Sequence, residues 1–149
     1  METEKEPCTR VGRFIQCLKH LGYDVSWADS AQVVAQGQHE FQLPVEFRAC
    51  ETHLLVRGRK VVGDYSPTHH ANLLTVANRL NRDCRLLRVS LSQFVDEAKC
   101  LVLQADANLP TEVTDREFHQ IFSLWSQELA WLTREFLNVS RTETAGCGL

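Results

Sequence analysis

The sequence predicts a single α+β domain, in which an antiparallel sheet of about five strands is covered by three helices mainly on one face, in the order α-βββ-α-ββ-α. Two hydrophobic patterns predict it. In three stretches apolar residues recur every three or four positions, as in an amphipathic helix, and in several shorter stretches they alternate with polar residues, as in a strand with one buried face. No repeat or low-complexity linker divides the chain. We therefore expect one domain over residues 9–139, a flexible lead-in over 1–8 and a disordered tail over 140–149.

The first helix is expected to begin at Cys8 or Thr9 and to end before Gly22, which can take the left-handed conformation that closes a helix. Its apolar residues form one stripe: Val11, Phe14, Ile15, Leu18 and Leu21. A stripe of this kind faces the core of a globular protein.

Three strands are expected between Tyr23 and Val62, with the clearest alternation through Phe41, Leu43, Val45 and Phe47. Residues 31–35 fit either a short strand or a helical turn. Residues 49–53 are the expected hairpin turn. Pro44 lies inside the clearest run and has no N–H to donate to a sheet, so it favours an edge or a bulge.

The second helix begins with strong signals, a capping Ser66 followed by Pro67, and ends over residues 81–85. Two alternating runs, 86–91 and 100–105, predict a hairpin after it, and residues 106–113 are expected to form a loop. Asn78 and Asn81 are mediocre helix formers. We expect their amides to bond backbone and to hold the corner between helix and strand.

The third helix is expected from a capping box, Thr114 with Glu117, to about Asn138. Its main apolar stripe consists of Phe118, Ile121, Phe122, Trp125, Leu129, Leu132 and Phe136. Leu124 and Trp131 lie off this stripe and are the expected partner or dimer surface, since aromatic side chains are enriched at interface cores.

Composition is that of an ordinary globular protein, with a net charge of −3 and a pI of about 6.1. The first residues are acidic and polar, and no apolar run approaches the ~20 residues that span a bilayer. A cytoplasmic protein with no membrane partner is the simplest interpretation. The six cysteines contain no Cys-x-x-Cys pair, so reduced thiols are expected.

No motif for a phosphate loop or a hydrolase nucleophile is present. His69 and His70 are adjacent and would point about 100° apart on a helix, which is unsuitable for holding one metal ion. We therefore expect no catalytic residue, cofactor or metal, and treat both histidines as solvated residues of a first helical turn.

The clearest charge feature is a set of four arginines, Arg79, Arg82, Arg85 and Arg88, and a second group contains Arg57, Arg59 and Lys60. Such groups can bind the phosphates of a nucleic acid or an acidic protein partner, or can simply be a solvated helix end. The acidic net charge disfavours nucleic acid.

One segment carries a family resemblance. Residues 74–82 read LTVANRLNR and run into the strand residues 86–90, followed by a second strand and a long helix. Over residues 11–136 this order resembles the YbjN family, described as candidate bacterial sensory transduction regulators, whose fold is similar to that of type III secretion chaperones. The resemblance implies a non-enzymatic regulatory or chaperone-like protein that is often dimeric. We therefore expect a protein-interaction module acting as a homodimer on a protein partner, with a nucleic-acid-binding regulator as the alternative.

Overall fold

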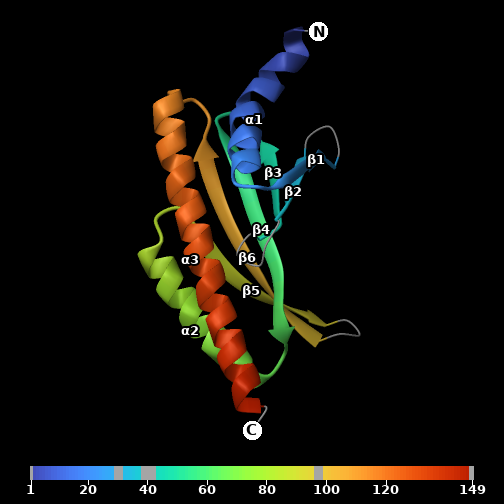
Figure 1. Ribbon diagram of the computed structural model, residues 1–149, viewed down its shortest axis with the longest axis vertical. Helices are drawn as coiled ribbons and strands as arrows, with labels where there is room; N and C mark the ends of the chain where they lie inside the picture. The colour runs from blue at the N-terminus through green and yellow to red at the C-terminus, as the bar shows by residue number, and fades with distance from the viewer. Residues whose placement is uncertain (1, 29–31, 38–42, 96–98, 148–149) are drawn as a thin grey trace.

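The computed structural model describes residues 2–28, 32–37, 43–95 and 99–147. Within these residues, three helices and six strands follow one another (Figure 1). They are α1 (Glu2–His20), β1 (Asp24–Trp27), β2 (Gln32–Gln36), β3 (Val45–Ala49), β4 (His53–Asp64), α2 (Pro67–Asp83), β5 (Arg88–Val95), β6 (Lys99–Pro110) and α3 (Asp115–Cys147).

The six strands form one antiparallel sheet in the order β1-β2-β3-β4-β6-β5. The two longest strands, β4 and β6, pair over most of their length and form its centre. A bulge interrupts their register between Val61 and Gly63. The chain reaches β6 from β4 through α2 and β5, so the last hairpin places β5 at the edge.

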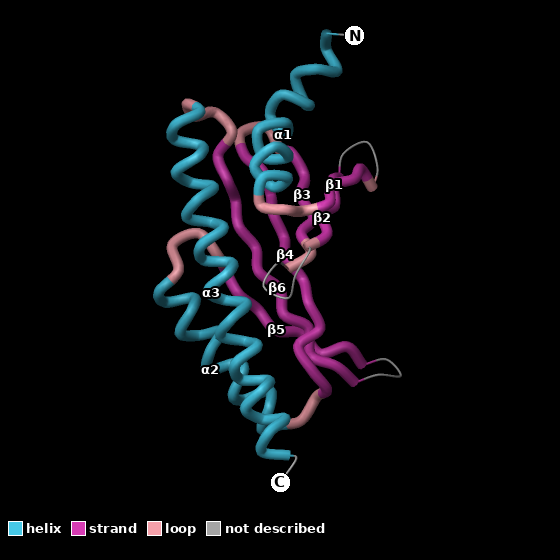
Figure 2. Tube along the Cα trace, viewed as in Figure 1, coloured by secondary structure: helices cyan, strands magenta, loops and turns pink. Residues whose placement is uncertain are grey.

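The helices lie along one face of this sheet, as Figures 1 and 2 show. α1 packs on β1 and β3, α3 on β4 and β6, and α2 on β5 and α3. Most strand positions alternate accordingly: residues that face the helices are buried and those between them are half-buried or exposed, with the buried Val102 of β6 as an exception. At the centre of the core, the Phe14 ring lies 4.5 Å from that of Phe47 and 5.4 Å from that of Trp125.

The α+β fold and the order of helices expected from the sequence are confirmed, but the described part of the chain forms a sheet of six strands rather than about five. Residues 32–35 of the ambiguous stretch belong to strand β2, which pairs with both β1 and β3, and residue 31 lies outside the described residues. Pro44 immediately precedes β3, and its carbonyl accepts a hydrogen bond from the Arg59 N–H. Phe41, expected in the same strand, lies outside the described residues.

Several boundaries differ from the expected ones. α1 begins at Glu2 and α3 ends at Cys147, so helix reaches into the segments expected to be a lead-in and a tail. β6 continues to Pro110, where a loop was predicted from Asp106, because β4 is long enough to pair with it that far. The caps are confirmed: the N–H of His69 donates to Ser66 Oγ at 3.0 Å and that of Glu117 to Thr114 Oγ1 at 3.2 Å.

Candidate interaction surfaces

The corner between α2 and β5 is held by one side chain that the sequence singled out. Asn81 Nδ2 donates to the carbonyl of Val89 at 2.8 Å, and Asn81 Oδ1 accepts from the Val89 N–H at 2.6 Å. The amide thus pairs with an edge strand as another strand would. This confirms the predicted structural role of Asn81, whereas Asn78 lies exposed on α2.

A second side chain holds the same corner from α3. Glu128 is 7% exposed, and its carboxylate accepts hydrogen bonds from three successive N–H groups, those of Arg85 at 2.7 Å, Leu86 at 2.9 Å and Leu87 at 3.2 Å. This role of Glu128 was not predicted from the sequence. The available signal was position, because Glu128 follows Trp125 by three residues and precedes Leu132 by four, and so lies on the core-facing side of the helix.

The four arginines predicted as a patch have different partners. Arg79 pairs with Glu135 of α3 at 2.6 Å, and Arg82 pairs with its neighbour Asp83 at 3.0 Å and thereby lowers the pKa of that carboxyl. Arg88 donates to the carbonyl of Leu87 at 2.9 Å. The Arg85 side chain is exposed. Two of the four charges are therefore balanced by carboxylates.

Leu124 and Trp131, the predicted partner surface, lie seven residues apart on α3 and so share one side of the helix. Both are half-buried. Trp131 packs against the core cluster, and its indole N–H donates to Glu135 Oε1 at 3.3 Å. Leu124 is outside that cluster and borders a shallow hollow of about 560 Å³, which is also lined by Gln120, Ser123 and Gln127.

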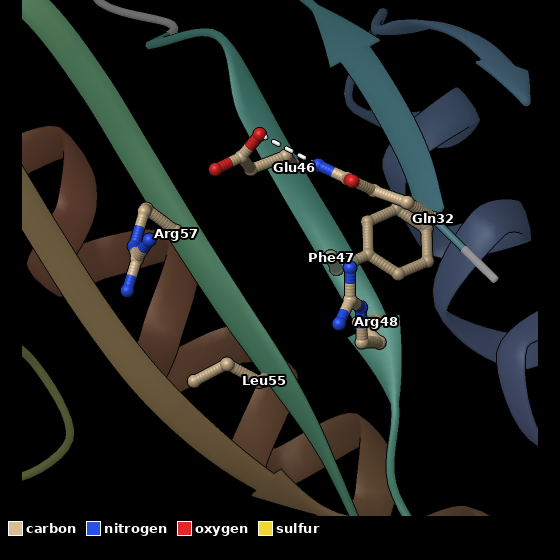
Figure 3. Close-up of a pocket in the computed structure, with 6 residues that line it drawn as sticks. All are labelled: Gln32, Glu46, Phe47, Arg48, Leu55 and Arg57. Carbon is tan, nitrogen blue, oxygen red and sulfur yellow. Dashed lines mark hydrogen bonds between the residues drawn. The ribbon is translucent and has the colours of Figure 1, made fainter. Parts of the chain in front are cut away.

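The face of the sheet away from the helices carries a second set of arginines. Arg57 donates to Asp106 at 2.9 Å, and Arg59 donates to Gln104 at 3.2 Å. Glu46 accepts from Gln32 at 2.7 Å. A hollow of about 180 Å³ on this face is bordered by Arg48, Arg57, Leu55 and Glu46. Figure 3 shows Arg48 and Arg57 on opposite sides of it.

Cys17, His20 and His119 line one hollow between α1 and the start of α3, together with Asp115. Among the described residues no group of three or more histidine, cysteine or carboxylate side chains could hold a metal ion. His69, expected to be solvated, is instead buried, with its Nε2 at 3.2 Å from the carbonyl of Val62. Burial raises the pKa of the Cys84 thiol to about 11, with a further contribution from Glu128, and it raises that of Cys17 against the influence of Arg13. Both thiols therefore stay protonated and poorly nucleophilic near neutral pH.

None of the helices, as far as the structure describes them, combines the length and the hydropathy needed to span a bilayer.

Comparison with solved structures identifies the fold. Over 84% of this chain and 89% of the other, the structure is similar to YbjN from E. coli, described as a candidate transcription regulator, with a TM-score of 0.56 and 13% identity. The chain has a YbjN-like fold. The resemblance expected from the sequence is thus confirmed at the level of architecture.

Two further structures are similar. An uncharacterized protein from Methanothermobacter thermautotrophicus matches with a TM-score of 0.53 and 11% identity, over 90% of this chain and 98% of that one. The heterodimeric ExoU–SpcU complex from the type III secretion system of Pseudomonas aeruginosa contains a chain that matches with a TM-score of 0.48 and 17% identity, over 82% of this chain and 93% of that one. No family model and no curated protein matches the sequence.

Proposed function

We propose that this protein is a non-enzymatic protein-interaction module, regulatory or chaperone-like, that acts as a homodimer on a protein partner. The observation that carries the proposal is the one-sided architecture, in which the described helices cover one face of a six-stranded sheet and leave the other open. That open face mixes charged groups with apolar ones such as Leu55, which is half-buried, and Val61, which is 58% exposed. A broad surface of mixed character suits binding to another protein.

The dimer is assigned to the outer side of α3 around Leu124 and Trp131. The hollow beside Leu124 is uncharged at Gln120, Ser123 and Gln127, and the two charged residues that also line it, Asp115 and Arg116, have opposite signs. Charges of one sign therefore do not dominate this surface. Interface cores are depleted of charged residues, and a two-fold axis brings the same patch together from both subunits. Leu124 is the better probe of this surface, because Trp131 also serves to bond Glu135 and hence to tie α3 to α2.

Light scattering after size exclusion, over a wide range of protein concentration, tests the dimer. We expect the wild-type protein to have the mass of two chains, and Leu124→Glu to shift it to one chain because the substitution places two carboxylates against each other at the two-fold axis. Leu74→Glu is the matched control. Leu74 is 39% exposed on α2, so the same substitution there leaves the mass unchanged. A wild-type protein that stays a strict monomer contradicts the dimer.

The alternative, a nucleic-acid-binding regulator, is not favoured by the contacts of the predicted patch. Arg79 and Arg82 each have a carboxylate partner, which reduces the charge available to phosphates. The alternative requires an affinity for nucleic acid that falls steeply as salt rises.

A further inference from the structure

The open face of the sheet carries a row of alternating charges. Cross-strand register places Glu46 opposite Arg57, Arg57 opposite Asp106 and Asp106 opposite Arg88, so the row crosses β3, β4, β6 and β5. Among these residues Arg57 is bonded directly to Asp106. Within this row, positive and negative charges balance.

Two more arginines on the same face lie on either side of the row. Arg48 is exposed, opposite Leu55 on β4, and forms no hydrogen bond or ion pair with a described residue. Arg59 is exposed, opposite Gln104 on β6, and donates to that neutral amide. Neither has a carboxylate partner among the described residues. Asp64, at the end of β4, lies on the same face. The described outward positions of β3, β4, β6 and β5 therefore carry four arginines and three carboxylates, an excess of one positive charge, although the chain as a whole is acidic.

The distance between these two arginines follows from the register. Arg48 is level with Leu55, which precedes Arg59 by four residues on β4, so the two arginines are about 13 Å apart along the strands. An extended peptide rises by the same amount per residue as a strand. It can thus present one carboxylate to each arginine from side chains four positions apart.

We propose that the open face of the sheet is a docking surface for an extended acidic segment of a partner protein, with Arg48 and Arg59 binding its carboxylates. The hollow between Arg48 and Arg57, floored by Leu55, accommodates an aliphatic side chain of the same segment (Figure 3). This inference rests on the proposed function, because it names the chemistry of the partner that the interaction module binds.

The arrangement favours an acidic peptide over a nucleic acid. Glu46 and Asp106 lie in the row between the two arginines. A continuous phosphate backbone would bring negative charge close to both of these carboxylates, which would repel it. A peptide can place an uncharged residue at the same point. A nucleic acid has continuous negative charge and an acidic peptide has spaced negative charges, and this difference distinguishes the two classes of partner.

Fluorescence anisotropy with labelled peptides tests this surface. The probe is a threonine- and valine-rich peptide with two glutamates four positions apart. The comparison probes have lysines in place of the glutamates, or the two glutamates adjacent. We expect the spaced glutamate peptide to bind most tightly, and its affinity to fall as salt rises, because the contacts are between exposed charges.

Charge reversals then locate the site. We expect Arg48→Glu and Arg59→Glu each to weaken binding by roughly fivefold and the double variant by more than tenfold, as each exposed pair contributes only part of the affinity. Arg134→Glu changes the net charge by the same amount at an exposed position of α3, and it serves as the control for net charge. We expect this variant to bind the peptide as the wild type does. Circular dichroism checks that each variant is folded.

Four results would overturn the inference: no binding of the spaced peptide at low salt, equal binding of the lysine peptide, equal loss in Arg134→Glu, or tighter binding of a single-stranded oligonucleotide than of the peptide. The dimer is measured separately by light scattering. Peptide binding by a strictly monomeric protein would remove the dimer and leave the docking surface intact.

Discussion

Gly63 is the residue whose backbone the fold constrains most visibly. It ends the bulge in β4 and has a φ of +133°, a region that side chains other than glycine rarely adopt. A Cβ added there would lie 2.8 Å from Nε2 of the buried His69. The bulge and the start of α2 are therefore packed against each other at a point that admits no side chain.

At this scale we predict that Gly63→Ala lowers the free energy of unfolding by about 2 kcal/mol, from backbone strain and the contact with His69. Gly12→Ala is the control, because Gly12 lies within α1 with no heavy atom within 4 Å of its added Cβ. It should stabilise by roughly 0.5–1 kcal/mol through helix propensity. Urea denaturation measures both. Equal effects of the two substitutions would show that the bulge is not constrained as described.

Single residues were predictable from the sequence where their role depends on near neighbours. Ser66 and Thr114 each cap a helix by accepting a hydrogen bond from the N–H three residues further on. Asn81 bonds the backbone of the residue eight positions further on. The burial of His69 was not predictable, because it depends on a bulge in a preceding strand.

At the scale of elements, Glu128 determines how α3 meets the segment between α2 and β5. Its carboxylate replaces the water that would otherwise bond the N–H groups of Arg85, Leu86 and Leu87. A buried charge is tolerated when it is fully hydrogen-bonded in this way. The contact joins residues more than forty positions apart, which local sequence patterns do not reveal.

We predict that Glu128→Ala lowers the free energy of unfolding by about 3 kcal/mol, because three N–H groups lose their acceptor. Glu128→Gln should have roughly half that effect, since the amide keeps one acceptor oxygen. Gln127→Ala, at an exposed neighbouring position, should change stability by less than about 0.5 kcal/mol. Urea midpoints that do not differ between Glu128→Ala and Gln127→Ala would contradict this role.

The helices and the last hairpin were predictable as elements because their periodicity is regular and their caps are strong. Strand β2 was ambiguous because Gln32–Gln36 is short and becomes a strand only through its pairing with β1 and β3. The end of β6 was placed too early for the same reason, since its last residues pair with β4. Long-range anchors such as Arg13, which bonds Asp115 at 2.8 Å and the carbonyl of Thr111 at 2.8 Å, have no local signal.

At the scale of the whole molecule, the open sheet face was the least predictable feature. The sequence showed Arg57 and Arg59 as a basic group but gave no reason to join them with Arg48. Only the register of β3 against β4 places the three on one face. The other predicted group lies at the end of α2, in the corner that follows it and at the start of β5: Arg79, Arg82, Arg85 and Arg88. There, Glu135 and Asp83 balance part of the positive charge.

The proposed function requires that the protein bind another protein through this open face. Affinity purification from nuclease-treated extract of the source cells, followed by mass spectrometry, tests that requirement with three baits: the wild type, Arg48→Glu/Arg59→Glu and the control Arg134→Glu. We predict that the same protein, with an acidic segment, is enriched in comparable amount by the wild type and the control and is lost with the double variant. Enrichment of no protein by the wild type, or equal enrichment by all three baits, would contradict the account.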